Sequence, residues 1–155
     1  MPTLVFKGEM PCSVERLWEF HRSAEALVRL SPPGQRVTLE GDAQVVAGAI
    51  HRIRIVRFGL PIHWTARIER VEPPAENRPG VFVDVAERSP LAAWRHEHRM
   101  ERTATGSRLT DTVTYTPPFG PLGRIADALF LRRDVEQLFA FRHRATRATV
   151  EESAV

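Results

Sequence analysis

The chain has 155 residues, 43% of them hydrophobic and 26% charged, which is ordinary for a globular protein. Its net charge of +3 is small and its arginines are interleaved with glutamates, so we expect no nucleic-acid partner. Apolar runs fall short of the roughly 20 residues of a membrane span, and the single Cys12 excludes an internal disulfide. The N-terminus lacks a signal-peptide pattern, so we expect one cytoplasmic domain over residues 1–155, without stable membrane insertion.

The N-terminal two thirds of the chain reads as a strand, two short helices and a series of strands. Ser13 can cap the first short helix and Ser23 the second, which ends at a Pro-Pro-Gly stop. The segment 44–57 does not alternate cleanly, and we expect a bulge there. Turn residues separate the predicted strands, which are 3–9, 35–40, 44–57, 62–72, 80–87, 92–103 and 107–116.

The last third of the chain predicts one long amphipathic helix. A proline-rich connector ends at Pro121, a residue suited to the first turn of a helix. Apolar residues then recur at helical spacing for about 27 residues. Consecutive strands joined by short turns favour an antiparallel sheet, and this helix is the only element long enough to cover its apolar face. The fold class is therefore α+β, with space for a small ligand between the curved sheet and the helix.

The most informative segment is a pair of alternating strands with polar residues on the face that should turn inward. A short loop at 103–106 sets a register that pairs Arg102 with Ser107. This register pairs His98 with Asp111, close enough for a charge-assisted hydrogen bond. The predicted inward residues are Trp94, His96, His98 and Met100 on the first strand, and Leu109, Asp111, Val113 and Tyr115 on the second.

This polar cluster has more than one interpretation. His98 could act as a base, with Asp111 as its orienting partner and Tyr115 as proton donor, or the group could orient a ligand oxygen. It could also be a buried network that only fixes the strand register. His96 and His98 with Asp111 could hold a metal, but the sequence marks no fourth ligand, so we expect neither metal nor cofactor. We expect Asp84 to pair with an arginine.

The chain resembles the START-related, birch-pollen-allergen-like superfamily, also called SRPBCC or polyketide cyclase/dehydrase-like. The likeness covers nearly the whole chain and is closest to a bacterial branch, in which Gly-Pro-Phe usually stands where this chain has 89–91, Ser-Pro-Leu. The segments that carry the resemblance are 11–18, 64–68, 82–84, 89–98, 108–123, 130–133 and 138–142. It implies a helix-grip fold of six to seven strands, and members include lipid carriers, quinone-binding proteins, cyclases and receptors.

We therefore expect a protein that binds a small hydrophobic molecule, such as a lipid, isoprenoid, quinone or polyketide-like compound. There are two alternatives. One is a cyclase/dehydratase-type enzyme that uses the His-Asp-Tyr cluster, and the other is a protein-interaction module that uses the arginine-rich helix. The sequence leaves the oligomeric state open. The expected ligand-binding residues are Trp64, Trp94, His96, His98, Met100, Asp111, Val113, Tyr115, Phe130 and Leu138.

Overall fold

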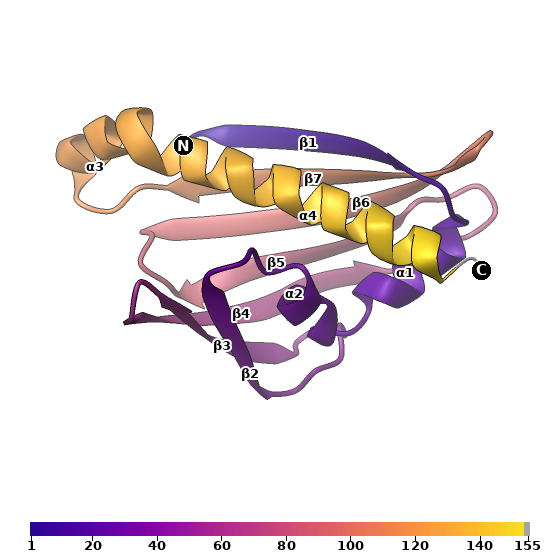
Figure 1. Cartoon of the computed structure of the whole chain (residues 1–155), viewed down its shortest axis with the longest axis horizontal. Coiled ribbons are helices and arrows are strands. Elements are labelled where there is room, and N and C mark those ends of the chain that lie inside the picture. Colours follow the sequence, from indigo (N-terminus) through magenta and orange to yellow (C-terminus); the bar gives the residue numbers. More distant parts are fainter. Residues whose placement is uncertain (154–155) are drawn as a thin grey trace.

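A computed structural model describes residues 1–153 and shows a curved antiparallel sheet with a long C-terminal helix lying along it (Figure 1). The strand order over these residues is β1-β7-β6-β5-β4-β3-β2, so the first and last strands are neighbours. The elements are β1 (Thr3–Met10), α1 (Val14–His21), α2 (Glu25–Arg29), β2 (Gln35–Gly41), β3 (Ile50–Arg57), β4 (Leu60–Glu72), β5 (Gly80–Arg88), β6 (Ala93–Thr103), β7 (Gly106–Thr116), α3 (Gly120–Ala126), a π-helical turn η1 (Asp127–Leu131) and α4 (Arg132–Glu152). This is the predicted helix-grip fold, with both short helices after β1.

The two short helices follow from local capping and spacing. Ser13 adopts an extended backbone, and its Oγ accepts a hydrogen bond from the Arg16 amide at 3.2 Å, as expected of an N-cap. The buried side of α1 then carries Val14, Leu17 and Trp18 toward the sheet. These side chains belong to an apolar cluster around Met100 on β6, which fixes one end of the fold.

The predicted strand 44–57 is shorter than expected, and its predicted bulge is wrong. β3 begins at Ile50 and pairs regularly with both β2 and β4. The preceding backbone bonds elsewhere, because the Val45 amide donates to the Arg22 carbonyl and the Gly48 amide to the Ile68 carbonyl, both at 2.8 Å. The register irregularities lie instead between β4 and β5.

The predicted register of the β6–β7 pair is confirmed over its full length. Arg102 pairs with Ser107, and His98 lies opposite Asp111. The loop between the strands is two residues long, which fixes the register without help from distant parts of the chain. Every predicted pair is reproduced, including Trp94 with Tyr115, His96 with Val113 and Met100 with Leu109.

The C-terminal helix departs from the prediction in its first part. α3 and η1 lie at the end of the sheet, where Leu122, Ile125, Leu129 and Phe130 are all exposed (Figure 1). β7 ends at Thr116 and a connector follows, so α3 and η1 begin past the end of the sheet. Of the C-terminal helical segments, α4 is the one whose apolar residues Val135 and Phe139 join the core cluster on the sheet. Within residues 1–153, no helix is long and apolar enough to cross a membrane.

Candidate functional site

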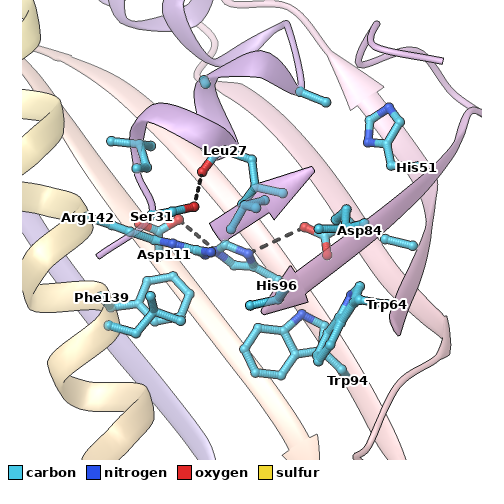
Figure 2. Close-up of a pocket in the computed structure, with 18 of the residues that line it drawn as sticks. Leu27, Ser31, His51, Trp64, Asp84, Trp94, His96, Asp111, Phe139 and Arg142 are labelled. Carbon is cyan, nitrogen blue, oxygen red and sulfur yellow. Dashed lines mark hydrogen bonds and ion pairs between the residues drawn. The ribbon is translucent and has the colours of Figure 1, made fainter. Parts of the chain in front are cut away.

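A cavity of about 400 Å³ lies between the inner face of the sheet and the helices α2 and α4. Its volume is in the range of pockets that hold small molecules. Trp64 and Trp94 pack edge to face in its lining, with ring centroids 5.2 Å apart, and Phe139 of α4 lies next to Trp94, with ring centroids 6.4 Å apart (Figure 2). Further apolar lining residues are Leu27, Val37, Val45, Ile53, Ile55, Ile62, Ala66, Ile68 and Leu138.

Asp111 is the centre of a buried polar group at one side of this cavity. Its Oδ1 accepts a hydrogen bond from His96 Nε2 at 2.8 Å, and its Oδ2 accepts one from His143 Nε2 at 2.6 Å. His96 lies on β6, two residues before His98, which is the residue directly opposite Asp111. His143 belongs to α4. His98 Nδ1 lies 3.1 Å from Asp111 Oδ1 but is not aligned for a hydrogen bond. The predicted pairing of His98 with Asp111 is therefore a close approach, and the hydrogen bonds go to His96 and His143.

Asp84 of β5 closes the group from the other side (Figure 2). Its Oδ2 lies 3.4 Å from His96 Nδ1 and 3.3 Å from His98 Nε2. The expected pairing of Asp84 with an arginine is wrong: residues 82 and 84 share the inward face of β5, where Asp84 lies directly opposite His96. His96 and His98 thus lie between the buried carboxylate of Asp111 and the partly buried carboxylate of Asp84.

Charge in the group is balanced by these contacts. Burial alone would lower the pKa of His96, but its hydrogen bonds with Asp111 and Asp84 raise the pKa to about 9. Burial alone would raise the pKa of Asp111, yet the donors His143 and His96 hold that pKa well below its usual range. The pKa of Asp84 is lowered for the same reason. The carboxylates are therefore ionised, and His96 carries a positive charge at neutral pH.

Arg142 of α4 brings a second positive charge to the cavity wall. Its guanidinium lies over the Phe139 ring, 5.3 Å from the centroid, and its Nε is buried without a hydrogen-bond partner in the described part of the chain. Burial lowers the pKa of Arg142, while the nearby Asp111 and Asp84 charges oppose this effect. An unpaired, desolvated donor at a cavity wall is suited to binding a ligand oxygen.

The structure brings together only part of the predicted ligand-binding set. Met100 and Val113 are fully buried in the core, and Phe130 is 68% exposed. Tyr115 is also fully buried, and its hydroxyl donates a hydrogen bond to Asp127 of η1 at 2.6 Å, away from the His-Asp group. The predicted residues that line the cavity are Trp64, Trp94, His96, His98, Asp111 and Leu138.

Asp84, His143 and Arg142 were not among the expected ligand-binding residues, although signals for them exist. Strand alternation puts Asp84 on the same face as Phe82. His143 follows Phe139 by four residues, one helical turn along the buried side of α4. Gly8 on β1 leaves the room that His143 needs, because a Cβ there would lie 2.6 Å from His143 Nδ1.

The chain belongs to the polyketide cyclase/dehydrase and lipid transport family. The sequence model of this family matches residues 10–142, and no curated protein matches at the level of the sequence. Membership in this family and the cavity together support ligand binding in the broad sense.

Solved structures from several organisms share the fold. Norcoclaurine synthase from Thalictrum flavum, a point mutant solved with a transition-state analogue, is 16% identical with a TM-score of 0.71, over 99% of this chain and 96% of its own. A protein from Thermus thermophilus is 22% identical with a TM-score of 0.64, over 96% of this chain and 99% of its own. One from Arthrobacter aurescens is 16% identical with a TM-score of 0.73, over 97% of this chain and 86% of its own.

Proposed function

We propose that the chain binds a small hydrophobic molecule with one oxygen-bearing end, of the lipid, isoprenoid, quinone or polyketide-like class. The observation that carries the proposal is the cavity of about 400 Å³, with apolar walls and a few polar groups on one side. Burying a ligand against such walls contributes roughly 25 cal/mol per Å² before the costs of association. The apolar walls therefore supply the affinity, and the polar side orients the ligand.

Arg142 and the His-Asp group are the polar end of the proposed site. The Arg142 guanidinium can donate to a carboxylate, carbonyl or phenolate oxygen, because its Nε has no hydrogen-bond partner among residues 1–153. Asp84 and Asp111 would repel an anion, so we expect the ligand oxygen to bind on the Arg142 side of the group. Trp64 and Trp94 offer ring faces and edges to an aromatic or polyene body.

An enzyme of the cyclase/dehydratase type is the second candidate. It is favoured by the hydrogen bond between His96 and Asp111, which orients an imidazole at the wall of a cavity. The proposed proton donor Tyr115 lends it no support, because its hydroxyl bonds Asp127 instead. The third alternative, an interaction module, calls for a filled interior, and the cavity argues against it.

The first experiment compares the native mass of the purified protein with its denatured mass and identifies any molecule released. We expect a stoichiometric apolar passenger with an oxygen at one end. An enzyme that binds its substrate only transiently would instead carry no passenger, and its pH–rate profile would shift in His96→Gln.

Two neighbouring residues of β3 give a matched pair of variants for this experiment. Ile55 lines the cavity, whereas Val56 lies on the opposite face of the strand. Ile55→Phe fills part of the cavity and should reduce the bound passenger, while Val56→Phe adds similar bulk outside and should not. Equal passenger in both variants, or none from several growth conditions, would contradict the proposal.

A further inference from the structure

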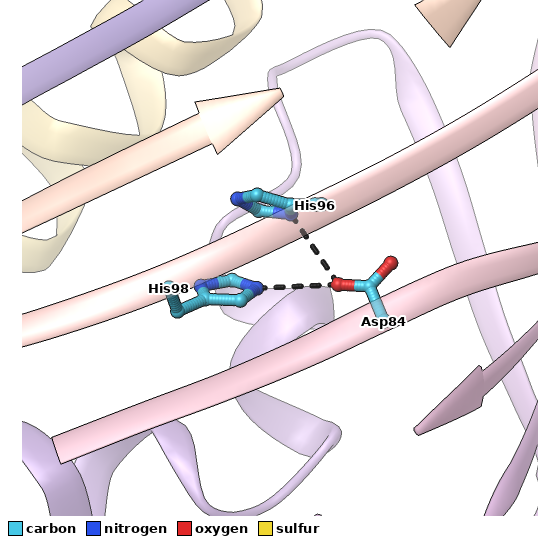
Figure 3. A group of neighbouring side chains, drawn as sticks. All are labelled: Asp84, His96 and His98. Atoms are coloured by element: carbon cyan, nitrogen blue, oxygen red, sulfur yellow. Dashed lines mark hydrogen bonds and ion pairs between the residues drawn. The ribbon is translucent and has the colours of Figure 1, made fainter. Parts of the chain in front are cut away.

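We propose that Asp84, His96 and His98 form a binding site for a divalent transition-metal ion, with Zn²⁺ as the best-fitting ion (Figure 3). The site lies in the same cavity as the proposed hydrophobic ligand, but its test needs no such ligand. His96 and His98 are two residues apart on β6 and point the same way, and Asp84 faces them from β5. One nitrogen of each imidazole and one carboxylate oxygen lie within 4.8 Å of one another.

The distances match the edges of a metal coordination shell as well as those of long hydrogen bonds, such as the one between His98 Nε2 and Asp84 Oδ2. Asp84 Oδ2 lies 3.4 Å from His96 Nδ1 and 3.3 Å from His98 Nε2, long for charge-assisted hydrogen bonds. Zn–N and Zn–O bonds of about 2.0–2.1 Å at a tetrahedral angle separate two ligand atoms by about 3.3–3.4 Å. Zn²⁺ binding between these atoms requires the Asp84 carboxylate to move back, because both imidazole nitrogens point at its Oδ2 (Figure 3).

Asp111 supplies the outer contact that metal-binding histidines usually have. Its Oδ1 accepts a hydrogen bond from His96 Nε2 at 2.8 Å, which leaves His96 Nδ1 as the nitrogen directed at Asp84. In a neutral imidazole this Nδ1 carries a lone pair, and a lone pair facing a carboxylate oxygen is repulsive. The arrangement therefore calls for a positive charge between His96 and Asp84, either a proton or a metal ion.

The donor set and its position indicate which ions fit. Two imidazoles and one carboxylate suit Zn²⁺ and other borderline divalent ions, whereas Mg²⁺ and Ca²⁺ prefer oxygen ligands. Three protein ligands leave one position of a tetrahedral ion free, as in open zinc sites. Because all three ligand residues line the cavity, that position can take water or a ligand oxygen.

The test is titration of chelator-treated protein with Zn²⁺ followed by calorimetry, and with Co²⁺ followed by its visible spectrum. We expect one Zn²⁺ per chain and the absorption of a four-coordinate Co²⁺ site. Asp84→Asn and His98→Gln should abolish stoichiometric binding, and Asp111→Asn should weaken it about 10–100-fold, since it removes only an outer contact. Circular dichroism establishes that each variant is folded.

His63→Ala is the matched control, because His63 is exposed on β4 and lies on the face opposite to the cavity-lining Trp64. It should leave binding unchanged. If Zn²⁺ and Co²⁺ fail to bind the unmodified protein, or bind equally well to folded Asp84→Asn, the proposal is overturned. Should the variants not fold, anomalous diffraction from a Zn²⁺-soaked crystal of the unmodified protein decides it, because the peak must lie between Asp84, His96 and His98.

Discussion

The two halves of the sheet carry similar apolar inner faces but are covered differently. Under α4, which lies along β1, Val113 and Tyr115 are fully buried and Phe139 is 1% exposed. On the β3–β4 half, Ile55 and Trp64 are only partly buried, because they line the cavity. The cavity is therefore a consequence of where the helix lies over the curved sheet, and the residue types alone do not produce it.

The largest expected effect comes from opening the packed half. Phe139 stacks on Phe6 with ring centroids 4.8 Å apart and meets the His96 ring edge to face at 4.9 Å. Phe139→Ala should lower the free energy of unfolding by about 3–5 kcal/mol, measured by urea denaturation. Phe130→Ala, at an exposed position of η1, should change it by less than about 0.5 kcal/mol. Similar losses in the two variants would contradict the difference in packing.

Removing the central carboxylate should cost nearly as much. Asp111→Asn leaves the positive charge of His96 with one carboxylate fewer in a buried site, and we expect a loss of about 3 kcal/mol in thermal unfolding. Asp127→Asn is the control, because Asp127 accepts the Tyr115 hydroxyl at a half-buried position and an amide oxygen can still accept it. Its expected loss is about 1 kcal/mol. If Asp111→Asn were as stable as the unmodified protein, the group would not be a buried ionic network.

Acid should destabilise the protein through His21, which stands at the cavity wall on α1. Burial lowers the pKa of His21 to about 4, against 6.5 in the unfolded chain. Between these values the unfolded chain binds a proton that the folded protein does not, so stability is complete above pH 6.5 and falls as the pH drops toward 4. The shift corresponds to about 3 kcal/mol. The free energy of unfolding, measured by denaturation at each pH, should fall by about 3 kcal/mol less in His21→Gln than in the unmodified protein between pH 6.5 and 4. The same pH dependence in both proteins would contradict this prediction.

The smallest effect is expected where the cavity already exists. Ile55→Ala removes side-chain atoms that face empty space, so few packing contacts are lost, and unfolding should become easier by less than about 2 kcal/mol. A loss as large as that of Phe139→Ala would mean that this half of the sheet is packed as tightly as the other.

Three residues at the polar side of the cavity, Asp84, His143 and Arg142, were not among the expected ligand-binding residues, each for a physical reason. Asp84 lies opposite His96 because of the register of β5 against β6, and these strands are joined by a longer loop than the tight turn between β6 and β7. His143 and Arg142 come from α4, and their place depends on the angle at which that helix crosses the sheet. The predicted cluster of Tyr115 with His98 and Asp111 is wrong. Tyr115 shares their strand face, but it lies four residues beyond Asp111 on β7, and its hydroxyl bonds Asp127 instead.

The sequence by itself determined an antiparallel sheet with a long C-terminal helix and the register of β6 against β7 over the described residues, whereas the helix-grip arrangement was implied by the family resemblance. The sheet, the helix and the register follow from local features, namely the two-residue period of a strand, a tight turn and a long amphipathic helix. The tertiary structure alone decided that His96 lies between Asp84 and Asp111, and that Arg142 faces a cavity. Such contacts depend on sheet curvature and helix position, which result from the packing of the whole chain and are not encoded in any short segment.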